Sequence, residues 1–533
     1  MRAIPLLRAS AAAIAAAGVA LPLPAQGVPA VDAVFARWAG TQSPGCAVMV
    51  ARDGRTVLNR AYGSADLEHG VANTPGTVFE AGSVSKQFTA AATLALAAQG
   101  KLKLDDDVRK HLPEMPDYGA RITIDHLLNH TSGLRDWGAV MSLAGWPRTT
   151  RAYTQEDVLE IVARQKSLNY LPGTEYSYTN SGYNLLAIIV ERVSGQSLAD
   201  FTAAQFFRPL GMADTGWRDN FRAIVPGRAI AYRKAKDGYE QLMPFEDTYG
   251  NGGLLTTTAD LMRWNEALTS GRLDPFVTAE LQRPARLSDG TPIGYARGLF
   301  VSTYRGQSEV WHSGTTAGYK AWLGRWPGER LSLAMLCNAG EIDSTLIAHR
   351  TIDAIRGLPA PVVSGSVPAA GRTGLFVDTR SGMPMTFVAK DGALAVEGGA
   401  PLGLLPSGRA DSPSGEIAFT AAGFDLFDGE KQRLAYRREQ PWTPAATELV
   451  GLAGRYASEE ADAAYVASLS GGKLVLSLDR RPQVRLTLTP AYRDAFAGKG
   501  MIVRIVRGAG GVPVGLGLGS SRVRNMIFLR TPS

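Results

Sequence analysis

The segment LPAPVVSGSVPAAG, residues 358–371, divides the chain and limits what can fold across it. It contains three prolines, which lack a backbone N–H and interrupt both helices and sheets. Before it, strand-type segments lie towards both ends and longer helix-type segments lie between them. After it, short alternating runs with glycine turns dominate, which is typical of small β-barrels or sandwiches. We therefore expect a domain over residues 26–357, a linker over 358–371, and a β-rich tail.

The first part carries strand signals near both of its ends. In residues 44–63, two apolar runs flank an Asp53-Gly54 turn, which is a good hairpin signal. Residues 318–340 predict two more strands about a Pro-Gly turn, and residues 343–357 predict a closing helix. Because helical segments fill the middle, we expect an α/β (α+β) domain with a largely antiparallel sheet and a helical insertion.

The tail contains a weak internal repeat. A Gly-Leu-Phe triplet beginning at Gly374 is followed eighteen residues later by another glycine. A Gly-Arg-Tyr triplet beginning at Gly454, 80 residues further along, shows the same spacing. A repeat of this length predicts two similar small antiparallel β-barrel domains, over residues 372–440 and 446–533.

The first 25 residues have the pattern of a secretory signal peptide. Arg2 and Arg8 precede an alanine-rich apolar run and a small-residue site that ends at Ala25. The run is shorter than the ~20 apolar residues that a membrane span needs. We therefore expect a periplasmic or secreted protein without a stable membrane span.

Charge and cysteine content exclude several classes of function. The formal charge is +7, but Lys and Arg are scattered, without the basic stripe that nucleic acid requires. Two cysteines, Cys46 and Cys337, are too few for a disulfide scaffold or a Cys-rich zinc site. Export would permit a disulfide between them. The sequence leaves open whether they form one or remain buried thiols, and it does not determine the oligomeric state.

The stretch AGSVSKQF places Ser83 three residues before Lys86 at the expected start of a helix. This spacing puts both side chains on one helix face, where an uncharged lysine could accept the serine proton. Helix N-terminal amides would also favour an oxyanion near Ser83. Ser85 is a poorer nucleophile candidate because it points about 100° away from Lys86. The pattern alone is weak, since Ser470-Gly-Gly-Lys473 also matches it.

Two further motifs could complete a catalytic site. Tyr178 and Asn180 stand in YSYTNSGYNLLA, where a phenol could act as a base and an amide could orient a substrate amide. Tyr249-Gly-Asn251 fits the same pattern, so the spacing alone is not specific. The stretch WHSGTTAGY contains His312 and Gly314. There, glycine would admit substrate to the backbone, and the next amide, at Thr315, could face an oxyanion.

These stretches, together with LLNHTSGL and GGLLTTTADLMRW, resemble serine hydrolases related to class C β-lactamases and penicillin-recognising enzymes. The resemblance covers about residues 30–357 with the three motifs in the family's order. It implies that Ser83 is acylated, that Lys86 is its proton partner, and that Tyr178 is the general base. Further implied roles are substrate orientation by Asn180 and an oxyanion hole formed by the amides of Ser83 and Thr315.

His312 stands where β-lactamases have the lysine of Lys-Thr-Gly. A histidine is mostly neutral at pH 7, so efficient binding of a β-lactam carboxylate is not expected. With its β-rich tail, the chain is similar in architecture to D-aminopeptidases, which implies activity on small peptides or amides with an N-terminal D-residue. Alternatives on the same fold are an esterase, a D,D-peptidase or a weak β-lactamase. A non-catalytic protein that binds cell-wall fragments is the alternative of another class.

We expect a small-molecule or short-peptide substrate and no cofactor or metal. His126 and His130 are spaced by four residues, but HLLNH lacks the glutamate of the His-Glu-x-x-His zinc motif. We therefore interpret both histidines as structural.

Overall fold

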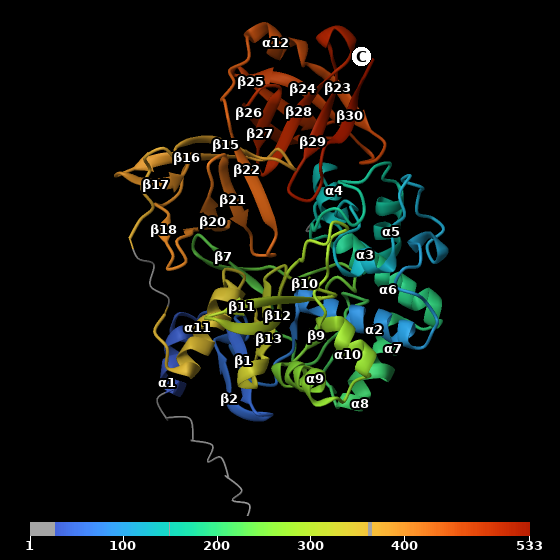
Figure 1. Cartoon of the computed structure of the whole chain (residues 1–533), viewed down its shortest axis with the longest axis vertical. Helices are drawn as coiled ribbons and strands as arrows, with labels where there is room; N and C mark the ends of the chain where they lie inside the picture. The colour runs from blue at the N-terminus through green and yellow to red at the C-terminus, as the bar shows by residue number, and fades with distance from the viewer. Residues whose placement is uncertain (1–26, 149, 361–364, 533) are drawn as a thin grey trace, which may run out of the picture.

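The computed structural model describes residues 27–148, 150–360 and 365–532 (Figure 1). Its core is a seven-stranded antiparallel sheet in the order β10, β11, β12, β13, β14, β1 and β2. The strands are β10 (Tyr295–Ala296), β11 (Leu299–Tyr304), β12 (Gln307–Thr316), β13 (Tyr319–Trp326), β14 (Leu331–Cys337), β1 (Cys46–Arg52) and β2 (Arg55–Tyr62). The signal peptide expected at residues 1–25 lies outside the described residues.

Local sequence explains both predicted strand pairs. Asp53 and Gly54 both have positive φ, 51° and 71°, as a two-residue hairpin turn between β1 and β2 requires. Strands β13 and β14 flank the turn at Pro327–Glu329. Because β14 pairs with β1, strands from the two ends of the domain lie side by side within the sheet. The expected antiparallel α/β (α+β) domain is confirmed.

Helices cover both faces of this sheet. The helices are α1 (Gly27–Phe35), α2 (Lys86–Ala98), α3 (Ile124–Leu128), α4 (Trp137–Leu143), α5 (Gln155–Ala163), α6 (Asn180–Ser194), α7 (Leu198–Thr202), α8 (Arg208–Leu210), α9 (Thr258–Ser270), α10 (Pro275–Gln282) and α11 (Ser344–Arg356). Alternate residues of β1 point to opposite faces. Cys46 and Val48 pack with α1 and α11, whereas Ala47 and Ala51 belong to the core that contains α2 and α9. None of the helices in the described residues is long and apolar enough to span a membrane.

Short strands complete the domain. They are β3 (Ser64–Asp66) with β4 (Val71–Ala72), β5 (Phe79–Glu80) and β6 (Gly216–Trp217) with β9 (Leu254–Thr256), and β7 (Tyr232–Ala235) with β8 (Gly238–Gln241).

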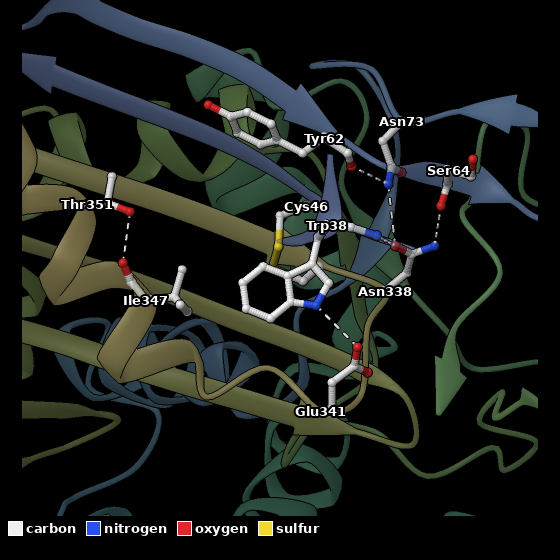
Figure 2. Close-up of a disulfide and its surroundings, with 11 residues drawn as sticks. Trp38, Cys46, Tyr62, Ser64, Asn73, Asn338, Glu341, Ile347 and Thr351 are labelled. Carbon is white, nitrogen blue, oxygen red and sulfur yellow. Dashed lines mark hydrogen bonds between the residues drawn. A yellow bond between two sulfur atoms is a disulfide. The ribbon is translucent and has the colours of Figure 1, made fainter. Parts of the chain in front are cut away.

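Cys46 and Cys337 lie opposite each other on β1 and β14 and form a disulfide (Figure 2). Beside it, the side-chain oxygen of Asn338 accepts a hydrogen bond from the backbone N–H of Gly45 at 2.8 Å. The disulfide therefore joins the first and last strands of the domain, which are 291 residues apart in sequence, at a point that hydrogen bonds already hold. This settles the alternative that the sequence left open.

Replacing both cysteines with alanine is expected to lower the free energy of unfolding by about 2–5 kcal/mol, because the crosslink closes a very long loop. Urea unfolding of the wild type and of the double variant, each with and without reductant, measures the loss. Reductant should destabilise the wild type and leave the double variant unchanged. Equal stability of all four samples would contradict this role for the disulfide.

The tail forms two antiparallel β units, drawn in orange and red in Figure 1. The first is an open eight-stranded sheet made of β15 (Gly374–Asp378), β16 (Pro384–Lys390), β17 (Ala393–Val396), β18 (Gly403–Leu404), β19 (Ala410–Ser412), β20 (Gly415–Phe419), β21 (Gly423–Phe427) and β22 (Arg433–Glu439). The second is a closed barrel made of β23 (Gly454–Ser458), β24 (Ala463–Ser470), β25 (Lys473–Leu478), β26 (Arg481–Pro490), β27 (Ala495–Gly498), β28 (Met501–Arg507), β29 (Pro513–Gly519) and β30 (Met526–Thr531), preceded by α12 (Ala446–Gly451). The expected β-rich tail is confirmed, whereas the proposed domain boundaries remain predictions.

In both tail units, an aromatic residue on the first strand pairs with an arginine on the last strand. In the first, Phe376 on β15 pairs with Arg438 on β22, whose guanidinium lies 4.6 Å from the phenyl centroid. In the second, Tyr456 on β23 pairs with Arg530 on β30, at 6.0 Å from the ring centroid. The glycine-led triplets found in the sequence are therefore the equivalent first strands of two related units.

Buried polar contacts hold the barrel against the helical part of the first domain. Arg135, which precedes α4, forms a 2.7 Å ion pair with Glu460 of the barrel. The hydroxyl of Tyr465 on β24 donates to the backbone carbonyl of Leu143 on α4 at 2.6 Å. The barrel is thus fixed beside α4, which places its loops close to the first domain (Figure 1).

Candidate active site

Ser83 lies in a tight turn immediately before α2. The turn, Gly82–Ser85, is a single 3-10 turn, so the α-helix begins at Lys86 rather than at the serine. Gly82 has a φ of 51°, and a side chain there would meet the backbone nitrogen of Thr315 at 2.6 Å. A side chain on Gly314 would meet the carbonyl oxygen of Ala81 at 2.0 Å. Glycine at both positions therefore lets the turn and β12 pack backbone to backbone.

This packing brings the amides of Ser83 and Thr315 next to each other. The position that a Cβ atom on Gly314 would take lies 3.1 Å from the Ser83 nitrogen, and the corresponding position on Gly82 lies 2.6 Å from the Thr315 nitrogen. Two neighbouring backbone amides beside a candidate nucleophile are groups that can stabilise a tetrahedral oxyanion.

Lys86 is fully buried and contacts the serine directly. Its Nζ lies 3.0 Å from Ser83 Oγ, and it donates to Asn180 Oδ1 at 2.9 Å and to the backbone carbonyl of Asn251 at 2.7 Å. Burial and, next, the positive charge of Arg522 hold the pKa of this amine well below its usual value. The lowered pKa favours an uncharged amine, which can accept a proton from Ser83.

Ser85 has a structural position instead. Its hydroxyl donates to the carbonyl of Gly82 at 2.6 Å and accepts from the backbone N–H of Leu254 at 3.1 Å. Both bonds stabilise the turn against β9, and Ser85 is not among the residues that line the cleft around Ser83.

Tyr178 lies across the cleft from Lys86, whose Nζ is 4.8 Å from the phenol ring centroid. The tyrosine is buried, and its hydroxyl has no regular hydrogen-bond partner among the described residues. Burial, followed by the negative charge of Glu430, raises the pKa of Tyr178 well above its usual value, whereas the neighbouring Ser83 side chain lowers it. The imidazole of His130 packs on the ring at 4.2 Å between centroids and fixes its orientation.

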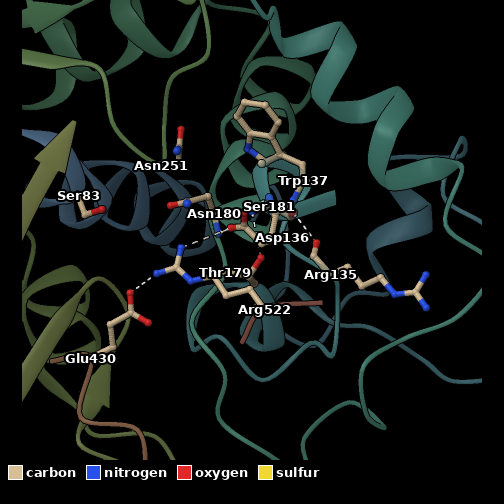
Figure 3. Close-up of polar contacts among 12 residues, drawn as sticks. Ser83, Arg135, Asp136, Trp137, Thr179, Asn180, Ser181, Asn251, Glu430 and Arg522 are labelled. Atoms are coloured by element: carbon tan, nitrogen blue, oxygen red, sulfur yellow. Dashed lines mark hydrogen bonds and ion pairs between the residues drawn. The ribbon is translucent and has the colours of Figure 1, made fainter. Parts of the chain in front are cut away.

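Asn180 is the first residue of α6 and connects the lysine to the helical part of the domain. Its backbone N–H donates to Asp136 Oδ2 at 2.8 Å, while its side-chain oxygen accepts from Lys86. Figure 3 shows Asn180 between Ser83 and Asp136, close to Arg522. With its oxygen held by Lys86, its amide NH₂ group is the part that could meet a substrate carbonyl.

His312 lies on β12, facing Tyr178 and Tyr295, and is buried. Its Nδ1 is 2.5 Å from the carbonyl oxygen of Ser313, which can only accept, so Nδ1 carries the proton. Nε2 then accepts from the hydroxyl of Tyr295 at 3.3 Å. Burial and, next, the charge of Lys86 lower the pKa of His312 to about 3. His312 is therefore uncharged at neutral pH and supplies no permanent positive charge for a substrate carboxylate.

The low pKa of His312 predicts a pH dependence of stability. The unfolded chain takes up this proton near the ordinary pKa of 6.5, whereas the folded protein takes it up only near pH 3. Stability should be complete above about pH 6.5 and should fall progressively as pH decreases towards 3. Urea unfolding over this range should give a steeper decline for the wild type than for His312→Gln. Parallel curves would show that His312 contributes nothing to the decline.

The residues around Ser83 form a cavity of about 290 Å³, and two of its walls come from the tail. Arg522 reaches it from the β29–β30 loop, and Glu430 from the β21–β22 turn. Together with Arg148 and Asn251, these are site residues that sequence reasoning missed. Nothing in their local sequence marks Arg522, Glu430 or Arg148, whereas Asn251 belongs to the second match to the unspecific Tyr-x-Asn pattern.

The other pattern matches lie elsewhere. Ser470 and Lys473 flank a two-glycine hairpin turn between β24 and β25, where no helix forms. His126 and the N-cap residue Thr123 form a reciprocal capping box at the start of α3, in which each side chain accepts a hydrogen bond from the other residue's backbone N–H. His126 does not line the cleft. His130 accepts a hydrogen bond from the backbone N–H of Thr179 at 3.3 Å, in agreement with a structural role.

Comparisons with known proteins agree with this geometry. A family model described as Beta-lactamase matches residues 31–355. A D-aminopeptidase of Brucella melitensis biotype 2 is 28% identical over 451 residues, which cover 81% of this chain and 83% of the relative.

Two solved structures share the fold. The octameric penicillin-binding protein homologue from Pyrococcus abyssi superposes with a TM-score of 0.53 at 19% identity, covering 92% of this chain and 96% of that one. The D-amino acid amidase from Ochrobactrum anthropi SV3, complexed with L-phenylalanine amide, has a TM-score of 0.53 at 22% identity, covering 62% of this chain and 98% of that one. Because the family model spans more than half of the chain, this protein belongs to the Beta-lactamase family and is a serine hydrolase.

Proposed function

We propose that this serine hydrolase is of the D-aminopeptidase type and releases an N-terminal D-amino acid from small peptides or amides. The observation that carries the proposal is Glu430, the one carboxylate among the described residues that line the cleft. Its Oε1 contacts Arg522, while Oε2 has no hydrogen-bond partner among the described residues. A free carboxylate oxygen there can bind the α-ammonium group of a substrate with an unblocked N-terminus.

The comparisons support the same substrate class. The Brucella relative is a D-aminopeptidase, and the Ochrobactrum structure is of a D-amino acid amidase. The uncharged His312 fits a substrate without a carboxylate at that end of the cleft, in contrast to a β-lactam. A cleft of about 290 Å³, closed on one side by the tail, suits a small acyl group.

The proposed reaction has two acyl-transfer steps. Ser83 Oγ attacks the substrate carbonyl, and its proton passes to the Lys86–Tyr178 pair while the amides of Ser83 and Thr315 stabilise the oxyanion. The C–N bond then breaks, and the leaving amine takes that proton. A water molecule attacks the ester on Ser83, again giving a proton to the pair. The C–O bond breaks, Ser83 regains its proton, and the free D-amino acid leaves.

The substrate class is tested by comparing hydrolysis of D-alanine p-nitroanilide, L-alanine p-nitroanilide, N-acetyl-D-alanine p-nitroanilide, p-nitrophenyl acetate and nitrocefin. We expect kcat/KM to be highest for the free D-anilide and at least about tenfold lower for the L-isomer and the acetylated compound. Glu430→Gln should raise KM for the D-anilide and leave KM for the acetate ester unchanged. Turnover of the ester alone would favour an esterase, preference for nitrocefin would favour a β-lactamase, and preference for the acetylated D-anilide would favour a D,D-peptidase.

We also propose that the protein is exported to the periplasm or the medium. The basic and apolar pattern of residues 1–25 supports this proposal. N-terminal sequencing of the protein from a cell fractionation should find a chain that begins near residue 26 outside the cytoplasm. An intact N-terminus in the cytoplasmic fraction would contradict it.

A further inference from the structure

Glu430 and Arg522 occupy equivalent positions in the two tail units. Glu430 precedes Arg438 of β22 by eight residues, and Arg522 precedes Arg530 of β30 by eight residues. Arg438 and Arg530 are themselves equivalent, since each pairs with the aromatic residue of its unit's first strand. Each unit therefore extends the turn before its last strand into the same cleft, and the two turns carry opposite charges.

The two charged residues meet beside the proposed catalytic groups. Arg522 and Glu430 form an ion pair, and Arg522 Nη1 also lies 3.8 Å from Asp136 Oδ2 (Figure 3). The same Asp136 oxygen holds the backbone N–H of Asn180, whose side chain contacts Lys86. The guanidinium carbon of Arg522 is 5.2 Å from the centroid of the Tyr178 ring. The ion pair thus contacts the catalytic machinery on both the tyrosine side and the lysine side.

The two charges act in opposite directions on the proton acceptors. After burial, Arg522 is the strongest influence that lowers the pKa of Lys86, and Glu430 raises that pKa. Glu430 likewise raises the pKa of Tyr178, and Arg522 lowers it. Other titratable or charged groups around the Lys86–Tyr178 pair are His130, Asp136, Arg148, Tyr176, Tyr183, Tyr295, His312 and Asp428.

We propose that Arg522 and Glu430 are positioning residues that set the charge balance around the Lys86–Tyr178 pair, so that the tail controls the activation of Ser83. This inference rests on the role of that pair in the proposed function. It gives the tail a part in catalysis as well as in substrate binding, because removing either unit removes one of the two opposing charges. Neither residue needs to touch the reacting atoms for this effect.

The test is the rate at which a fluorophosphonate labels Ser83, measured against pH across the range in which each variant stays folded. This probe reports activation of the serine and does not depend on D-amino acid specificity. The variants are Arg522→Gln, Arg522→Lys and Glu430→Gln. The control is Arg455→Gln, which breaks the ion pair with Asp479 on the same barrel, away from the cleft.

Arg522→Gln should move the lower limb of the pH profile upward by about one unit, and Glu430→Gln should move it downward. At pH values below the lower limb, moving that limb upward by one pH unit lowers the labelling rate about tenfold. Arg522→Lys should restore the wild-type profile, and Arg455→Gln should not change it. Opposite shifts support the inference, since simple loss of structure would move both variants in the same direction.

Shifts in one direction, or no shift in either variant, would overturn the inference while leaving the serine hydrolase intact. A wild type that is labelled but prefers L-anilides or esters would overturn the D-aminopeptidase proposal and not this inference. A wild type that is not labelled at all would overturn both.

Discussion

Replacing Ser83 with alanine is expected to lower kcat/KM for every hydrolysed substrate by at least about 10⁴-fold. The serine oxygen is the atom that Lys86 contacts at 3.0 Å, and it lies beside the paired amides of residues 83 and 315. Without it, the remaining groups can polarise a carbonyl but cannot form a covalent intermediate. Steady-state hydrolysis of D-alanine p-nitroanilide, with enzyme concentration fixed by absorbance, measures the loss.

Two other serines provide matched controls. Ser470→Ala changes the second Ser-x-x-Lys motif, which is an exposed hairpin turn, and should leave both activity and stability unchanged. Ser85→Ala removes two buried hydrogen bonds and should lower the free energy of unfolding by about 1 kcal/mol per bond while the folded enzyme remains active. If Ser83→Ala retained activity and Ser85→Ala lost it, Ser85 would be the nucleophile.

Replacing Tyr178 with phenylalanine is expected to reduce kcat by about 10²–10⁴-fold without destabilising the protein. Apart from its interaction with Ser83, the buried hydroxyl has no regular hydrogen-bond partner among the described residues, so its removal is expected to cost the fold little and to relieve the burial of a polar group. Reduced turnover in an equally or more stable protein is the signature of a catalytic group. The two measurements are kcat and the free energy of unfolding in urea.

The control for this variant is Tyr465→Phe, which removes a buried hydroxyl that does form a bond, to the carbonyl of Leu143 at 2.6 Å. It should lose about 1 kcal/mol of stability and keep its kcat. A Tyr178→Phe enzyme with wild-type kcat would leave Lys86 as the sole proton acceptor for Ser83.

Short sequence signals predicted those parts of the fold that depend on the conformational preferences of a few neighbouring residues. Asp53-Gly54 predicted the β1–β2 hairpin because both residues accept positive φ. The motifs around Ser83, Tyr178 and His312 predicted residues that line one cleft, since each motif is a turn or strand end with its own requirements. The disulfide between Cys46 and Cys337 could not be chosen over two thiols, because it depends on β1 pairing with the last strand of the domain.

Tertiary docking determined what the sequence could not predict. Arg522 and Glu430 lie in turns of ordinary composition, and their role follows from how the two tail units sit against the first domain, the barrel through Arg135 and Glu460. The start of the helix after Gly82 also could not be predicted from the sequence, because it depends on a contact with a distant strand. The positive φ of Gly82 and its contact with Thr315 replace the first turn of the expected α-helix with a 3-10 turn.

The most direct test of the central claim is mass spectrometry of the protein after treatment with a fluorophosphonate. We expect one adduct per chain, located by peptide mapping on Ser83, and no adduct on the Ser83→Ala variant. An adduct on another serine, or an unlabelled wild-type protein, would contradict a mechanism based on an acyl-enzyme at Ser83. The unlabelled outcome would in addition favour the alternative of a non-catalytic protein that binds cell-wall fragments on this fold.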